Sequence, residues 1–348
     1  MGYQNLGGSP PRIYVDYLSY WHSQGLLKGA GRYEYYANNL IDGSLLGLNP
    51  SNTTNFTITS GAGYDFVVFN LFPFDETAPI FTTPDSKMFS AILGHNFATN
   101  SGLYYNLEEV DVDHSTHSPA ATFNQINPLP SAIPLDGFTI NHHTPSITEL
   151  AGVHFQIMSY TNQDWKFGSF AFGHYFDCPV SPDLSLTMSH EYDGIKTIRT
   201  KGGSTLSNAN YYKPPNWGDR EAWQLGDFPY YYNGRRSWDL SFSYISDSDI
   251  EPYSYYGNKW DSDTSPSPTH SEGGDNWFQN VLYYTMGSHL PFIFCPDPSI
   301  EYYYDSSHPE RPPRVPEFAI CRFDMNSFKR TLVAHKMYSI SVKVVESW

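Results

Sequence analysis

The chain has 348 residues, enough for two domains or for one large β-rich domain with insertions. Aromatic residues make up 17% of it, with 28 Tyr, 23 Phe and 8 Trp, and such a surplus of large, half-polar rings is typical of contact surfaces. Lys and Arg number 20 against 36 Asp and Glu, and the resulting charge of -16 argues against a surface that holds nucleic-acid phosphates.

The three cysteines, Cys178, Cys295 and Cys321, are widely spaced and form no C-x-x-C pair, so neither a disulfide framework nor a cysteine zinc site is predicted. The first residues show no signal-peptide pattern, and no stretch approaches the roughly 20 apolar residues of a membrane span. We therefore expect synthesis in a reducing cytoplasm and three buried free thiols. The apolar neighbours of Cys295 predict an unreactive thiol.

Gly and Pro, 26 of each, interrupt the chain throughout, which indicates many short strands joined by turns and predicts a mainly β fold. Residues 12–20 begin with strand-like alternation, and a turn-rich joint near Pro50 closes an N-terminal segment, 1–50. Residues 51–176 are predicted to form a β-sandwich of the jelly-roll or galectin-like kind. Residues 110–137 contain too many turn formers for a regular element and are predicted to form a long loop. The five strand candidates of the middle region are FTITS, YDFVVFNLFPF, MFSAILGHNF, GVHFQIMSYT and KFGSFAFGHYF.

The region 177–348 has the clearest patterns, two half-buried strands with a helix between them. The helix is predicted near 276–286, with Asp275 as N-cap and Gly287 as the C-terminal stop. Its apolar stripe comprises Trp277, Phe278, Val281, Leu282 and Thr285. The core face of the first strand comprises Arg236, Trp238, Leu240, Phe242 and Tyr244. The core face of the last strand comprises Tyr338, Ile340, Val342 and Val344.

The stretch LPFIFCPD, residues 290–297, is a short apolar strand closed by Pro291 and Pro296. Because proline is excluded from central ladder positions, we expect this strand to lie at a sheet edge or to end sharply. An apolar edge followed by three tyrosines and proline-flanked arginines suits contact with a partner. The predicted subunit-interface residues are Pro291, Phe292, Phe294, Tyr302, Tyr303, Tyr304, Arg311 and Arg314.

Three groups of residues suggest chemistry. Asp111, Asp113, His114 and His117 could bind a metal, but a solvated loop is favoured because no known ligand spacing is matched. The acidic run 245–275 holds carboxylates of the kind that glycosidases use, without a rigid element to fix their separation. Aromatic runs such as Tyr230 to Tyr232 could stack on sugars or line a protein interface. We predict no catalytic residue, no cofactor and no metal.

From about Phe172 to Trp348 the chain resembles tail proteins of bacteriophages, especially distal-tail and related tube-end proteins. The segments that carry the resemblance are GRRSWDLSFSYISDSD, NWFQNVLYYTMGSHLPFIFCPD and FAICRFDMNSFKRTLVAHKMYSISVKVVESW. The middle region, with AILGHNF, is similar to the jelly-roll or galectin-like part of such proteins. The acidic insertion 245–275 and the N-terminal segment depart from this pattern.

The resemblance implies a tail-tube-like β-barrel with one packed helix in 177–348 and a structural, non-enzymatic role. Subunits of such proteins form a homo-oligomeric ring at the distal end of the tail, assembled in the host cytoplasm, and link the tube to tip, hub or receptor-binding proteins. DNA would pass an acidic lumen without adhering to it. Two other functions stay open at this point, a virion module that binds host-surface carbohydrate and a β-sandwich glycan hydrolase.

Overall fold

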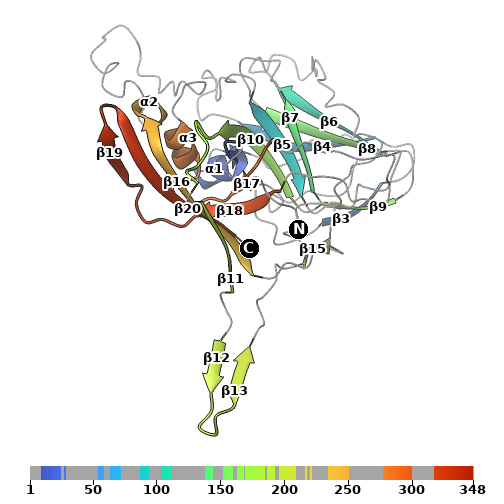
Figure 1. Cartoon of the computed structure of the whole chain (residues 1–348). Helices are drawn as coiled ribbons and strands as arrows, with labels where there is room; N and C mark the ends of the chain where they lie inside the picture. Colours follow the sequence, from blue (N-terminus) through green and yellow to red (C-terminus); the bar gives the residue numbers. More distant parts are fainter. Residues whose placement is uncertain are drawn as a thin grey trace, which may run out of the picture.

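A computed structural model gives the structure of the protein (Figure 1). It describes residues 9–24, 27–28, 54–58, 63–71, 87–93, 103–110, 138–143, 152–159, 163–167, 169–184, 186–192, 196–208, 216–217, 220–221, 234–250, 277–299 and 317–347.

The described part of the chain is mainly β. The helices are α1 (Tyr17–Ser23), α2 (Asp247–Ile250) and α3 (Trp277–Tyr284). The strands are β1 (Arg12–Asp16), β2 (Leu27–Lys28), β3 (Thr54–Ile58), β4 (Gly63–Leu71), β5 (Met88–Leu93), β6 (Leu103–Val110), β7 (Phe138–His143), β8 (Gly152–Ser159), β9 (Gln163–Phe167), β10 (Ser169–Asp177), β11 (Thr187–Glu191), β12 (Lys196–Arg199), β13 (Thr205–Asn208), β14 (Asn216–Trp217), β15 (Arg220–Glu221), β16 (Arg235–Ser246), β17 (Phe292–Cys295), β18 (Ala319–Phe323), β19 (Arg330–Ala334) and β20 (Met337–Glu346).

The largest element is an antiparallel sheet of ten strands, in the order β11-β16-β20-β18-β17-β1-β10-β5-β7, with β19 paired to β20. The first strand of the chain, β1, lies in its middle and pairs with β10 on one side and β17 on the other. Within the described residues the pairing path runs from β11 to β7 without closing, so we see a long sheet there and no closed barrel.

Strand β17 lies inside the sheet, between β1 and β18, and the expectation of an edge position for LPFIFCPD is wrong. Pro291 and Pro296 stand just outside its four residues, so neither removes a ladder hydrogen bond, and the expected sharp termination is confirmed. All four side chains are buried because the strand contributes to two cores. Phe292 and Phe294 pack into one core, and Ile293 and Cys295 pack into the other.

Helices α1 and α3 both contribute to the larger core, which lies on one face of the long sheet (Figure 1). The helix predicted near 276–286 is confirmed as α3, and Phe278 and Val281 of its predicted stripe are fully buried. The side chain of Trp277 and the predicted N-cap Asp275 lie outside the described residues. Helix α1 was not predicted. Its N-cap is Asp16, whose carboxylate accepts hydrogen bonds from the backbone N–H groups of Leu18 and Ser19.

The two half-buried strands of the C-terminal region are confirmed as β16 and β20, with one correction. In β20, Ile340, Val342 and Val344 face the core as predicted. In β16 the pairing with β20 shifts between Phe242 and Ile245. This bulge reverses the alternation, so that Tyr244 is 66% exposed and Ile245 takes the predicted core place.

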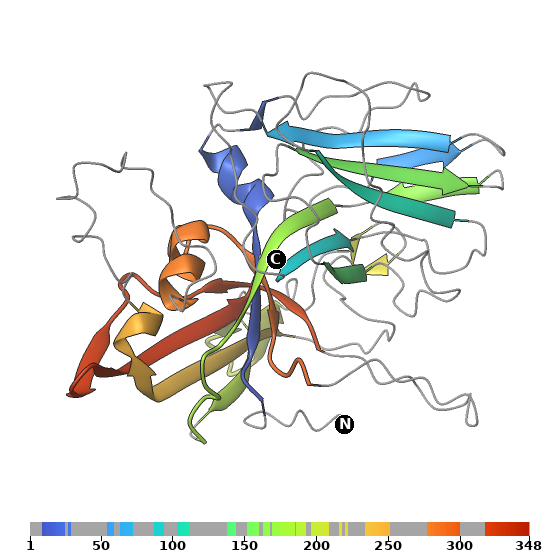
Figure 2. The ribbon, with the colours of Figure 1, turned by 90° about the horizontal axis from the view of Figure 1, so that it is seen from above.

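Strands β2, β3, β4, β6, β8 and β9 build a sandwich-like region beside the β5 and β7 end of the long sheet (Figure 2). One sheet has the order β2-β4-β8-β6, and β3 pairs with β9. Each of the five strand candidates of the middle region overlaps a strand, whereas β6 and β7 were not predicted. The predicted loop falls outside the described residues beyond Val110.

The long sheet crosses both boundaries that the sequence suggests. Strand β1 belongs to the segment 1–50, and β5, β7 and nearly all of β10 belong to 51–176, yet all continue the sheet of the C-terminal region. The division into 1–50, 51–176 and 177–348 therefore stays a prediction about folding units, which fragment experiments can test.

Candidate functional site

A two-stranded hairpin formed by β12 and β13 stands away from the other labelled strands (Figure 1). We call residues 196–208 the arm. The N–H of Thr200 donates to the carbonyl of Ser204 at 2.8 Å, and Gly203 takes a φ of 85° in the connecting turn. From Lys196 to Ser207 the side chains are exposed, apart from half-buried Thr200. The arm therefore offers nearly all of its side-chain surface for contact.

Two apolar side chains face one another across the arm. Ile198 and Leu206 are direct partners in the register, and they are 64% and 59% exposed. A hairpin of two strands is only marginally stable by itself in water, so its apolar pair gains most when a further surface covers it. The pair is thus a candidate contact point for another molecule.

Strand β11, which precedes the arm in the chain, ends beside the start of β16, and we call this end of the β11–β16 pair the root. The last pair of that ladder joins Glu191 to Arg235. The Glu191 carboxylate accepts from the Lys343 ammonium at 2.6 Å and from the Ser237 hydroxyl at 3.0 Å. The hydrogen bond with Lys343 lowers the pKa of Glu191 and raises that of Lys343. Gly234 precedes β16 with a φ of 82°, and a Cβ there would lie 3.1 Å from the Glu191 carbonyl oxygen.

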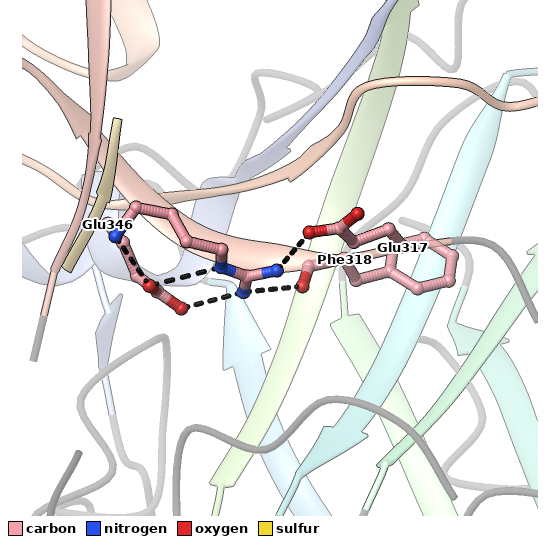
Figure 3. Close-up of polar contacts among 4 residues, drawn as sticks. Glu317, Phe318 and Glu346 are labelled. Atoms are coloured by element: carbon pink, nitrogen blue, oxygen red, sulfur yellow. Dashed lines mark hydrogen bonds and ion pairs between the residues drawn. The ribbon is translucent and has the colours of Figure 1, made fainter. Parts of the chain in front are cut away.

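Beside this root, the buried side chain of Arg236 joins three segments of the C-terminal region (Figure 3). Its Nε and Nη2 donate to the two oxygens of Glu346, at 3.1 and 2.7 Å, and its backbone N–H donates to the same carboxylate at 3.1 Å. Nη1 donates to Glu317, and Nη2 also reaches the carbonyl of Phe318 at 3.1 Å. We call Arg236, Glu317, Phe318 and Glu346 the Arg236 cluster. It joins the start of β16 to β20 and to the entry of β18.

A second polar cluster is formed by side chains of β1, β7 and β10. Tyr14 shares a hydrogen bond of 2.9 Å with Nε2 of His142, and their rings stack at 5.6 Å. Arg12 donates to Asp177 at 2.6 Å and lies 4.3 Å above the ring of Tyr175. Burial raises the pKa of Tyr14, whereas partial burial and the nearby Arg12 charge lower that of His142 to about 4. Both pKa values are then far from 7, so that His142 is a weak base and Tyr14 a weak acid, which does not favour proton transfer by this pair.

The predicted interface residues fall into two groups. Pro291 is buried, and Phe292 and Phe294 have 0% exposed surface, so the reading of these three as subunit contacts is corrected to core residues. The physical reason is the internal position of β17, which leaves no free edge or face. The other predicted contacts, Tyr302, Tyr303, Tyr304, Arg311 and Arg314, lie outside the described residues.

The remaining candidates divide in the same way. The metal-like residues Asp111, Asp113, His114 and His117 lie outside the described residues, and within the described ones no group of three or more potential ligands gathers. The three cysteines are confirmed as free and buried. Burial raises the pKa of Cys295 to about 12, in agreement with the predicted unreactive thiol.

Sequence reasoning missed the arm, although a signal was present. The run TKGGST, residues 200–205, lacks the glycine spacing of a phosphate-binding loop. Read instead as a turn, Gly202 and Gly203 between two short segments with β-branched residues indicate a hairpin.

No protein-family model, curated protein or solved structure matches the chain. Within the part of the chain that the structure describes, none of the helices has the length and apolar character that crossing a bilayer requires. The site is therefore interpreted from its own geometry.

Proposed function

We propose that the chain is a structural virion protein that assembles with copies of itself into a ring at the distal end of a bacteriophage tail. In this role it links the tail tube to tip or receptor-binding proteins. The proposal rests on the resemblance of the C-terminal region to distal-tail and tube-end proteins, and on the arm as the means of contact between subunits.

The segments that carry the resemblance lie together in space. Strands β16, β20, β18 and β17 are consecutive in the long sheet, and α3 packs on the core that this sheet forms. In the finer form of the proposal, this region belongs to a tail-tube-like β-barrel, and the sandwich-like region corresponds to an outer jelly-roll or galectin-like domain. The strong negative charge would keep DNA from adhering as it passes through the ring.

The observation that carries the assembly role is the arm, a hairpin that stands away from the other labelled strands and exposes the apolar pair Ile198 and Leu206. Homo-oligomers with closed rings reuse one such contact at every subunit.

Mass photometry of the purified full chain across a concentration series tests the proposal, with electron micrographs of the assembled fraction. We expect a discrete oligomer and ring-shaped particles. A chain that stays monomeric at every concentration, or that forms only irregular aggregates, would refute the ring.

A further inference from the structure

The arm has the opposite charge from the rest of the chain. Its residues 196–208 include Lys196, Arg199 and Lys201 and no Asp or Glu. The arm thus holds three of the 20 Lys and Arg residues and none of the 36 acidic ones, which leaves 17 cations against 36 carboxylates elsewhere. All three cationic side chains are exposed. A basic hairpin therefore stands out from a strongly acidic protein.

The charge of the arm indicates what kind of surface can bind it. Two arms cannot pair with each other favourably, because six cations would come together and like charges repel. The complementary surface must be acidic, and it must also cover the apolar pair Ile198 and Leu206. The remainder of a second copy of this chain meets the charge requirement and is present wherever the first copy is.

Nucleic acid and anionic membranes are less suitable partners. Three cations make at most about three phosphate contacts, which gives weak binding that salt readily removes. A phosphate polymer or an anionic bilayer would also be repelled by the acidic remainder of the same chain. Nucleic-acid phosphates would also leave the exposed isoleucine–leucine pair uncovered, and a bilayer could cover that pair only against the repulsion of the acidic remainder.

We infer that the arm docks on an acidic surface of a second copy of the chain, away from that copy's own arm. The cations steer and orient the contact, and Ile198 and Leu206 supply its apolar centre. Because the arm and its receiving surface differ, the contact is heterologous, and repetition of it closes a ring or extends a filament. This inference rests on the proposed self-assembly and specifies the surface that performs it.

Two arm variants and one matched control test the inference. The charge variant is K196Q/R199Q/K201Q, and the apolar variant is I198T/L206T. The control, K329Q/R330Q/K336Q, removes three exposed cations from the β19 region instead. Because the arm side chains are exposed, circular dichroism and the urea-unfolding midpoint should match the wild type in both arm variants.

Mass photometry then gives the concentration at which each protein assembles, in salt of about 0.05 M and about 0.5 M. We expect high salt to weaken wild-type assembly, and we expect each arm variant to need about tenfold more protein, as the loss of several exposed contacts predicts. The charge variant should also lose most of its salt dependence, whereas the control should behave as the wild type.

A carbodiimide that joins amines directly to carboxylates identifies the partner. In a mixture of isotopically light and heavy chains, we expect cross-links from Lys196 or Lys201 of one chain to Asp or Glu of another.

A monomeric wild type would refute the proposed function itself. A wild type that assembles while the arm variants assemble equally well, or while the control loses as much, would refute the arm contact alone. Arm-dependent binding to a fluorescent DNA duplex or to phosphatidylserine vesicles, without these cross-links, would show that this ligand and not a second copy is the partner of the arm.

Discussion

At the scale of single residues, the Arg236 cluster places a buried arginine against a buried carboxylate, that of Glu346. Burying a guanidinium and a carboxylate removes both from water, and only good geometry with further hydrogen bonds offsets that cost. Arg236 has such geometry, because its side chain and backbone together donate three hydrogen bonds to Glu346. The consequence is that neither partner can be removed without leaving the other charge buried.

We therefore predict that Glu346→Gln lowers the free energy of unfolding by about 3 kcal/mol. The neutral amide keeps the size of the side chain but leaves the arginine charge without its buried counter-charge. Urea unfolding monitored by circular dichroism measures the loss. Asp324→Asn is the control, because Asp324 is exposed and its side chain forms a long ion pair of 3.6 Å with Lys343. Equal stabilities of the two variants would show that the Arg236 cluster contributes little.

Asp16 predicts a dependence of stability on pH. Burial raises its pKa to about 6, although hydrogen bonds from Ser19, Phe172 and Leu18 act in the opposite direction. A carboxyl whose pKa is higher in the folded than in the unfolded state favours folding at low pH. That contribution is lost as the pH rises from about 4, where the unfolded group ionises, to about 6.

Relative to Asp16→Asn, the wild type should thus lose about 3 kcal/mol of unfolding free energy between pH 4 and pH 7, since a difference of roughly two pKa units corresponds to that energy. Both proteins are unfolded with urea at a series of pH values. The asparagine keeps an acceptor at the N-cap and cannot titrate, so a difference between the two proteins that is constant with pH would contradict the raised pKa.

Residue patterns predicted the burial of Arg236 but not its partners. Alternation placed Arg236 on the same face as Trp238, and both are buried. The partners Glu317 and Glu346 could not be predicted, because they lie 81 and 110 positions away and only the strand pairing brings them to Arg236.

At the scale of elements, the sequence predicted the end of α3 correctly but not the residue that takes the left-handed conformation there. Gly287 donates to the carbonyl of Leu282 at 2.8 Å, and Met286 donates to that of Tyr283 at 3.1 Å, as in a Schellman motif. The left-handed position that usually holds glycine is occupied by Met286, with a φ of 51°, and Gly287 follows it with a φ of 71°. The helix stops where predicted, with a strained methionine at its end.

We predict that Met286→Gly stabilises the protein by about 0.5–1 kcal/mol, because glycine adopts the left-handed conformation without steric cost. Met286 is 41% exposed, and its sulfur accepts weak hydrogen bonds from Ser23 and Gln24, which glycine and alanine remove equally. Met286→Ala is the control, since alanine shortens the side chain but keeps the Cβ that causes the strain. Thermal and urea unfolding should rank glycine above alanine, and an alanine variant as stable as the glycine variant would rule out strain as the cause.

Strand β17 shows why the neighbours of an element are harder to predict than the element itself. Its apolar run and flanking prolines indicated a short strand, which is confirmed. The inference of an edge failed because the prolines lie outside the ladder, and because β1, nearly 280 positions earlier, fills the place beside it. A run with every residue apolar is in fact typical of a strand buried on both faces.

At the scale of the whole molecule, the central place of β1 determines how the chain can be divided. Composition and turn signals suggested joints near residues 50 and 176, but hydrogen bonds across the sheet do not follow the chain order. Strand β1 joins the strands of the middle region to those of the C-terminal region, so both regions depend on an N-terminal segment that is remote from most of them in sequence.

This dependence predicts the behaviour of fragments. Residues 51–176 expressed alone should aggregate or fail to unfold cooperatively, because β10 would lose its partner β1 from Gly173 onward, and Phe170 and Phe172 would lose most of the larger core that buries them. Residues 1–176 restore β1 and should be more soluble, but the other edge of β1 then lacks β17. We expect only the full chain to unfold in one cooperative transition by circular dichroism and calorimetry. A soluble, cooperatively folded 51–176 fragment would show instead that the four-stranded sheet and the β3–β9 pair have a sufficient core of their own. The long sheet would then be an interface between two domains that fold separately.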